Sequence, residues 1–178
     1  MSVQTSTVMD SMLKMDVLAQ KVQQTEDLVV DHEEDWRGLS FVVGGRKIIA
    51  STSEITEIVE YPESMTVVPN TPDWMVGLAH FHGDVLTVSD LQCFLGGVPT
   101  TLDYQSKILV VKYLGKYFGF LVPSVLGLRY LPLDRKREYS PLDNIIDTFI
   151  YEVFDYQNQI WPVISFSSVL TDRRFMMD

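Results

Sequence analysis

The chain has few of the features that membrane-spanning or disulfide-bonded proteins need. Its 178 residues include one cysteine, Cys93, so no disulfide can form within it. We expect this cysteine to be a small buried hydrophobe in a reducing compartment. No apolar run approaches the roughly 18 residues that a membrane span requires, and the first residues have no continuous apolar segment typical of a secretory signal. The sequence therefore predicts a cytoplasmic protein that does not insert into a membrane.

Basic side chains are also scarce. The chain has 14 lysines and arginines against 24 aspartates and glutamates, which gives a formal net charge of −10. Such a surface repels phosphate backbones and anionic lipid headgroups. We therefore expect no nucleic-acid binding and no direct adsorption to membranes.

Signatures of catalysis and of cofactor binding are missing as well. No Gly-x-Ser-x-Gly elbow is present, and Cys93 has no base nearby in the sequence. The pairs Gly44-Gly45 and Gly96-Gly97 are isolated and are not followed by the Lys-Ser/Thr of a phosphate-binding loop. The sequence therefore predicts a protein that is not an enzyme, needs no cofactor and acts by binding.

What the chain does have is a series of short β-strands between glycine and proline turns. Hydrophobic residues make up 46% of it and charged residues 21%, as in an ordinary folded protein. This texture favours a mainly β fold with small barrels over a parallel α/β sheet. We predict strands over 39–43, 46–50, 55–61, 107–113, 117–122, 127–131, 149–154 and 160–164, short helices over 91–95 and 166–170, and a solvated loop over 134–139.

A faint internal repeat runs through these elements. A strand, a glycine turn and a second strand occur over 41–50 and again over 109–122, and a strand followed by a short helix occurs over 85–95 and again over 160–170. Each copy is too small to bury a core alone. The repeat therefore predicts two small barrel-like sheets that share one hydrophobic core.

The ends of the chain differ in texture from its middle. Residues 1–35 form an N-terminal extension that we expect to be partly helical or disordered, with an apolar helical face over 10–24. That face packs on the domain or docks a partner. Residues 36–172 form the folded domain, and residues 173–178 follow it as a C-terminal tail.

Residues 65–97 organise the domain, because their local chemistry fixes a definite order of parts. Pro69 ends a strand, and Asn70 and Pro72 favour a turn. Gly83-Asp84 suits a two-residue hairpin turn, and Asp90 can cap a short helix. The predicted parts are a strand over 65–68, a turn over 70–72, one helical turn over 73–76 released by Gly77, an extended segment over 78–82, a strand over 85–88 and the helix over 91–95.

This order resembles the signature of CheW-like domains, the adaptors that couple chemoreceptors to histidine kinases. The matching residues are Asn70-Thr71-Pro72, Gly77, His80-Phe81-His82-Gly83, Val85 to Val88, Asp90-Leu91 and, upstream, Ile55-Thr56-Glu57-Ile58. His80 and His82 stand where the family usually has Asn and Arg. The resemblance covers roughly 39–170, and with the N-terminal extension the chain is most similar to the CheW-like proteins of type IV pilus (twitching) systems.

The resemblance implies a fold of two five-stranded SH3-like barrels around a common core. It also implies a non-catalytic adaptor that bridges the regulatory domain of a CheA-type histidine kinase and the cytoplasmic tip of a methyl-accepting chemoreceptor. Such an adaptor is recruited from the cytoplasm to membrane receptor arrays through its partners. Carried over by position, the partner-binding residues are Ile55, Glu57, Gly77, His82 and Gly83. We expect the two glycines to be turn residues in any case.

Two other functions stay open because of the histidines. Residues two apart on a strand share a face, so His80 and His82 with Asp84 suit a small-ligand or metal-binding barrel. Histidine in place of arginine at position 82 loses the permanent charge and predicts a contact that depends on pH near neutrality. It also leaves room for a kinase-binding inhibitor that binds no receptor.

Overall fold

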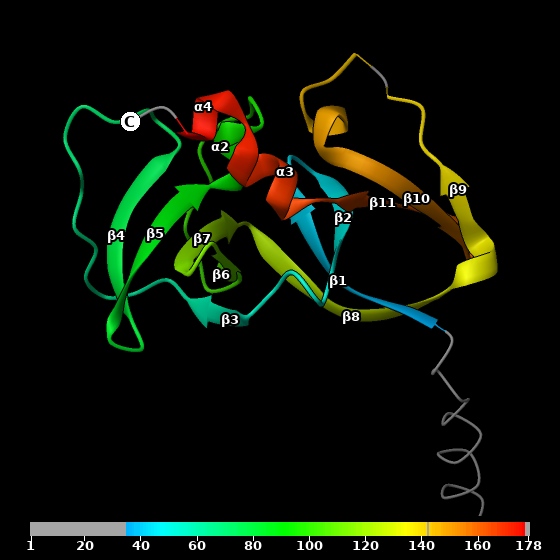
Figure 1. Ribbon diagram of the computed structural model, residues 1–178, viewed down its shortest axis with the longest axis horizontal. Helices are drawn as coiled ribbons and strands as arrows, with labels where there is room; N and C mark the ends of the chain where they lie inside the picture. Colours follow the sequence, from blue (N-terminus) through cyan, green and yellow to red (C-terminus); the bar gives the residue numbers. More distant parts are fainter. Residues whose placement is uncertain (1–34, 142, 177–178) are drawn as a thin grey trace, which may run out of the picture. The chain divides into compact units, whose positions relative to one another are not determined.

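The computed structural model describes residues 35–141 and 143–176, and in this part the chain forms two β-sheets with short helices beside them (Figure 1). The helix predicted over 10–24 lies outside the described residues. The first sheet has the strand order β8 (Ser124–Pro132), β1 (Asp35–Val43), β2 (Arg46–Ser51), β11 (Gln159–Ile164), β10 (Ile150–Tyr156), β9 (Lys136–Glu138). The second has the order β3 (Glu57–Glu60), β6 (Lys107–Tyr113), β7 (Lys116–Val122), β5 (Asp84–Asp90), β4 (Met75–Phe81).

The internal repeat appears in the pairing of the strands. In each sheet a hairpin, β1–β2 or β6–β7, pairs in parallel with a strand that leads into a helix: β2 with β11, and β7 with β5. The two halves of the chain exchange these parts, because β3 pairs with β6 and β8 pairs with β1. Each sheet therefore combines the hairpin of one half with strands from the other half.

This exchange places one large apolar core between the sheets. Phe41 of β1 and Phe120 of β7 are both fully buried, and the ring of Phe166 packs between them, with centroid distances of 6.1 and 4.7 Å. Phe166 begins α3 (Phe166–Thr171), where the Ser165 side chain accepts a hydrogen bond from the Ser168 backbone N–H. A mainly β fold with a core shared between two sheets is therefore confirmed.

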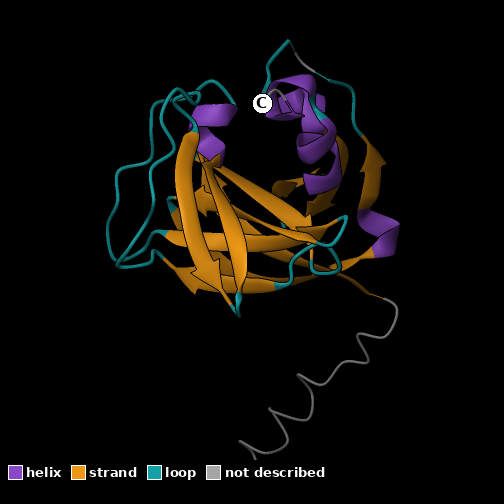
Figure 2. Ribbon diagram, turned by 60° about the vertical axis from the view of Figure 1, so that its left-hand side comes forward, coloured by secondary structure: helices purple, strands orange, loops and turns teal. Residues whose placement is uncertain are grey.

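The remaining helices are short and lie beside the sheets (Figure 2). Within the described residues, no helix has both the length and the apolar composition to cross a bilayer. The sequence set residues 173–178 apart as a tail, whereas Phe175 packs against the shared core. Besides α3 the helices are α2 (Leu91–Phe94), α4 (Arg173–Met176) and the 3-10 turns η2 (Leu133–Arg135) and η3 (Ile146–Phe149).

The solvent exposure predicted over 134–139 is confirmed for residues 134–138, but the prediction of a loop there is wrong. Arg137 and Glu138 pair with Val153 and Glu152, and Lys136 forms an ion pair with the nearly buried carboxylate of Glu152. These contacts make β9 an edge strand of the first sheet. Among the described residues this sheet therefore has six strands, whereas the resemblance implied five.

The strand predicted over 65–68 is also wrong, since only Thr66 pairs, in an isolated bridge with Leu78. Their backbone groups exchange two hydrogen bonds of 2.8 Å. The helical turn predicted over 73–76 is wrong as well, because Asp73 and Trp74 form only a tight turn, closed by the Met75 N–H bond to the Pro72 carbonyl, and β4 begins at Met75. Cys93 is only partly buried, since it lies in α2, a helix of four residues at the edge of the core.

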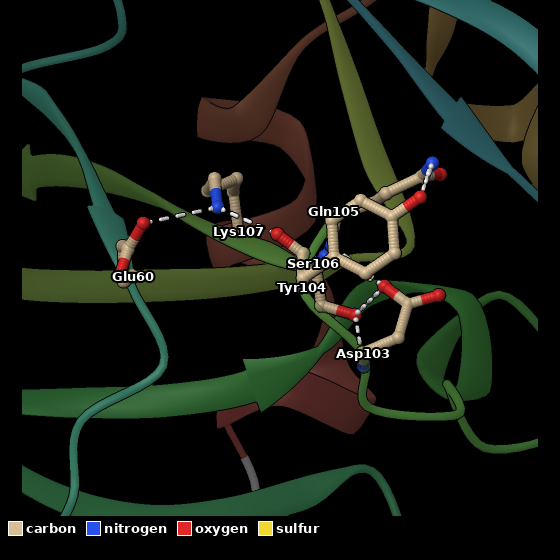
Figure 3. A network of polar contacts seen from close by, with 6 residues as sticks. All are labelled: Glu60, Asp103, Tyr104, Gln105, Ser106 and Lys107. Carbon is tan, nitrogen blue, oxygen red and sulfur yellow. Dashed lines mark hydrogen bonds and ion pairs between the residues drawn. The ribbon is translucent and has the colours of Figure 1, made fainter.

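Two aspartates organise the connector between α2 and β6. Asp90 accepts from the Cys93 backbone N–H at 3.1 Å, which caps α2, and from the Thr100 backbone N–H at 2.6 Å. Asp103 accepts from the backbone N–H groups of Gln105 and Ser106 at 2.8 and 3.1 Å. Figure 3 shows this second turn leading into Lys107, whose ammonium reaches Glu60 on β3. The connector thereby fixes where β6 begins beside β3.

Candidate partner-binding surface

The β4–β5 hairpin turns at His82 and Gly83, one residue earlier than predicted. Both residues have positive φ, 48° for His82 and 82° for Gly83, as a type I′ turn requires at its two central positions. Asp84 therefore pairs in β5 instead of turning. The expectation that His80 and His82 share a strand face is wrong, because only His80 lies on the strand.

The structure brings two of the predicted site residues into direct contact. Nε2 of His82 lies 2.8 Å from Oε2 of Glu57 on β3, and their side chains are 67% and 43% exposed. β3 and β4 stand at opposite ends of the strand order, so this contact helps to close the second sheet on itself. An exposed pair of this kind contributes only about 0–1 kcal/mol to stability. The pair instead fixes the orientation of two polar side chains next to Gly83. The space beside Gly83 is open, since an added Cβ there would meet no atom within 4 Å.

A groove lies beside this pair, where the two sheets meet. Its volume is about 260 Å³. Ile55 lies in its wall and also packs against the shared core, while Glu57 stands at its rim. We call it the inter-sheet groove, and its lining residues are Leu39, Thr52, Ile55, Thr56, Glu57, Ile58 and Leu128.

Strand β8 contributes to this groove one apolar residue that sequence reasoning missed. Leu128 is 58% exposed, and Ile58 across the groove is 41% exposed. Exposed apolar side chains gathered in one place mark interaction sites.

Gly77, also predicted as a site residue, is buried and presents no surface. It sits at a bulge in β4 with φ 154°. A Cβ added there would lie 2.6 Å from the Thr66 carbonyl oxygen and 2.7 Å from Cγ of Met65. Any part that Gly77 plays in binding is therefore through the shape of β4.

Metal-ligating side chains are not gathered in the described part of the chain. Residues 35–141 and 143–176 contain no group of three His, Cys, Asp or Glu side chains placed to hold a metal ion. Burial, and then the nearby charges of Asp90 and Asp73, raise the pKa of the Cys93 thiol. This thiol is therefore a poorer nucleophile than an ordinary cysteine at neutral pH.

Comparison with known proteins agrees with this geometry. The model of the CheW-like domain family matches residues 37–174, which is most of the chain. The chain belongs to the CheW-like family, as its resemblance over 39–170 predicted, and is a non-catalytic adaptor of chemosensory signalling.

The chain is also similar in sequence and in fold to individual chemosensory proteins. The chain is 33% identical to the protein PilI of Pseudomonas aeruginosa over 133 residues, which are 74% of each chain. It is 27% identical to the chemotaxis protein CheW of Helicobacter pylori over 92 residues, 52% of this chain and 55% of that one. The fold matches the crystal structure of the scaffolding protein TtCheW from Thermoanaerobacter tengcongensis with a TM-score of 0.71 and 19% identity, covering 80% of this chain and 97% of the other.

Proposed function

We propose that this chain couples a methyl-accepting chemoreceptor to a CheA-type histidine kinase in a chemosensory pathway that controls twitching by type IV pili. The observation that carries the proposal is the inter-sheet groove in a CheW-like domain, with an apolar wall and a polar rim. The similarity to PilI over 74% of both chains supports the link to pili. The partner-binding residues we propose are Ile55, Glu57, His82 and Gly83, with Gly77 shaping the strand behind them.

The groove suits the helical tip of a receptor. Helices bind grooves through apolar residues spaced along one face, and Ile55, Ile58 and Leu128 offer apolar contacts from both sheets. Glu57 and His82 add hydrogen-bonding groups at one end of the groove, which would set the direction of a bound helix.

The kinase would bind elsewhere, through its own CheW-like regulatory domain. Among the described residues, the edge strands β9 of the first sheet and β4 of the second contribute no residue to the lining of the groove. Unpaired backbone groups of an edge strand can pair with the edge of a similar barrel. This separation leaves the groove free, so one adaptor can hold both partners at once.

Calorimetry of the full chain with a soluble cytoplasmic segment of the co-encoded receptor tests the groove. We expect Leu128→Ser to weaken this binding about tenfold, as the loss of a central apolar contact does, and to leave kinase binding unchanged. Leu114→Ser is a matched control, because Leu114 is 85% exposed in the β6–β7 turn and outside the groove. Equal affinity of wild type and Leu128→Ser for the receptor segment would refute the assignment of the groove.

The same experiment separates a second candidate, a kinase-binding inhibitor that binds no receptor. That candidate is favoured by His82, which stands where the family usually has an arginine and contacts Glu57. It predicts micromolar kinase binding with no detectable receptor binding. Receptor affinity that stays constant from about pH 6 to 8, where histidine ordinarily titrates, would exclude a role for the charge of His82.

A further inference from the structure

A second, larger cavity of the described residues lies away from the inter-sheet groove and shares no lining residue with it. Its volume is about 730 Å³, within the range of small-molecule sites. β5 and β7 form one wall, and the segment before β4 and helix α4 form the others. Its lining residues are Asn70, Thr71, Pro72, Trp74, Met75, Thr87, Ser89, Lys116, Phe118, Phe175 and Met176.

One end of the cavity is aromatic. The rings of Trp74 and Phe175 stack with a centroid distance of 5.0 Å and an interplanar angle of 17°. Phe118 meets Phe175 edge-on at 6.1 Å. All three side chains are only partly buried, so they leave an apolar surface against which a flat or chain-like apolar group can pack.

The polar groups of the lining lie at two separate places. Lys116, at the start of β7, is the one charged residue in the lining, and its ammonium has no ion-pair partner among residues 35–141 and 143–176. Asp84 lines an adjoining hollow that shares Thr87 and Lys116, but it forms no ion pair with the lysine. Ser89 lies at the far end of the same wall from Lys116, where β5 pairs with Met75 and Phe120. It is fully buried, and its hydroxyl has no hydrogen-bond partner within the described part of the chain.

We propose that this cavity binds a small amphipathic carboxylate, with its apolar body against Trp74, Phe118 and Phe175 and its carboxylate at Lys116. A buried hydroxyl without a partner is costly in a folded protein, so a ligand with a further hydrogen-bonding atom beside Ser89 should bind more tightly than one without it. A carboxylate can form a charge-assisted hydrogen bond with an ammonium that has no other partner. The proposed adaptor function does not use this cavity, and ligand binding here does not depend on that function.

Binding of octanoate and of its neutral isostere octanamide to the purified full chain, measured by calorimetry, tests the proposal. We expect wild type to bind octanoate about two- to fivefold more tightly than octanamide, the range of an exposed ion pair. Lys116→Gln should lose this preference and keep octanamide binding. Lys112→Gln is the matched control, since it removes an equal charge from the same sheet outside the cavity, and it should keep the preference.

A second variant tests the location independently of charge. Thr87→Phe places a ring inside the cavity and should abolish binding of both compounds, with an unchanged circular dichroism spectrum. If this variant does not fold, tryptophan fluorescence shows where the ligand binds, because Trp74 is the one tryptophan in the lining. Octanoate should change the emission of wild type and of Trp36→Phe, but not that of Trp74→Phe. No octanoate binding at millimolar concentration, or a preference that survives in Lys116→Gln, would overturn the proposal.

Discussion

Replacing Gly77 by alanine tests how β4 is built, and with it how variants at this position should be interpreted. The added Cβ would lie 2.6 Å from a backbone oxygen, that of Thr66. Backbone atoms cannot rotate away as a side chain end can, so the segment around Thr66 must move. Moving it breaks the bridge to Leu78 and its two hydrogen bonds of 2.8 Å.

The cost follows from these two effects. Each hydrogen bond contributes about 0.5–1.5 kcal/mol net, and an unfavourable backbone conformation at a residue other than glycine costs about 1–3 kcal/mol. We therefore expect Gly77→Ala to lower the free energy of unfolding by about 2–6 kcal/mol. For a domain of this size that corresponds to a loss of roughly 4–24 °C in melting temperature.

Urea unfolding followed by tryptophan fluorescence measures the effect, with Gly83→Ala as the matched control. Gly83 also has positive φ, but its added Cβ meets no atom within 4 Å, so only the backbone cost of about 1–2 kcal/mol applies. A Gly77→Ala protein as stable as Gly83→Ala would refute the close approach of β4 to Thr66. If the prediction holds, a loss of partner binding in Gly77→Asp reflects a distorted β4.

Three further changes have expected outcomes. Arg46→Ala should cost about 1–3 kcal/mol in urea unfolding because it leaves Asp147, 1% exposed, without its cation at 3.4 Å; Lys47→Ala next to it should change little. Hydrogen bonds from Arg174 lower the pKa of Asp172 from its ordinary value of 3.8. The charged form therefore stabilises the folded state above that value, and the stability gap between wild type and Asp172→Asn should close as pH falls below it; a gap that persists to about pH 2 would contradict this. Glu57→Gln should change melting temperature by no more than about 4 °C, since its pair with His82 is exposed; a larger loss would make the pair structural.

The sequence predicts most strands because their turns are local. Gly44-Gly45 and Leu114-Gly115 sit between apolar runs, and both pairs take the positive φ values of tight hairpin turns. The β4–β5 turn is displaced by one residue from the prediction, because His82 takes the first positive φ position without being a glycine. Local composition favours Gly83-Asp84 there, whereas the register of β5 requires Asp84 in the strand.

Contacts between distant segments were beyond local reasoning. The repeat predicts two sheets, but the exchange of strands between the halves depends on pairings such as Val163 with Ile49, which no local pattern encodes. β9 was missed for the same reason, since its charged sequence resembles a loop until Glu152 supplies a partner for Lys136.

The candidate site was likewise predicted only in part. The resemblance predicted Glu57 and His82 as partner-binding positions, but it did not predict their contact. Leu128 was missed because a strand over 127–131 was predicted without asking which face would remain exposed. Its exposure follows from the position of β8 at the edge of the first sheet, next to β3 of the second.

The central claim is that this chain holds a receptor and a kinase together. Sedimentation of the full chain with the kinase regulatory domain and the receptor segment, separately and together, tests it most directly. We predict a ternary complex in which Leu128→Ser holds the receptor segment about tenfold more weakly, while the kinase component stays bound. Failure of wild type to bind the kinase domain, or displacement of one partner by the other, would contradict the account.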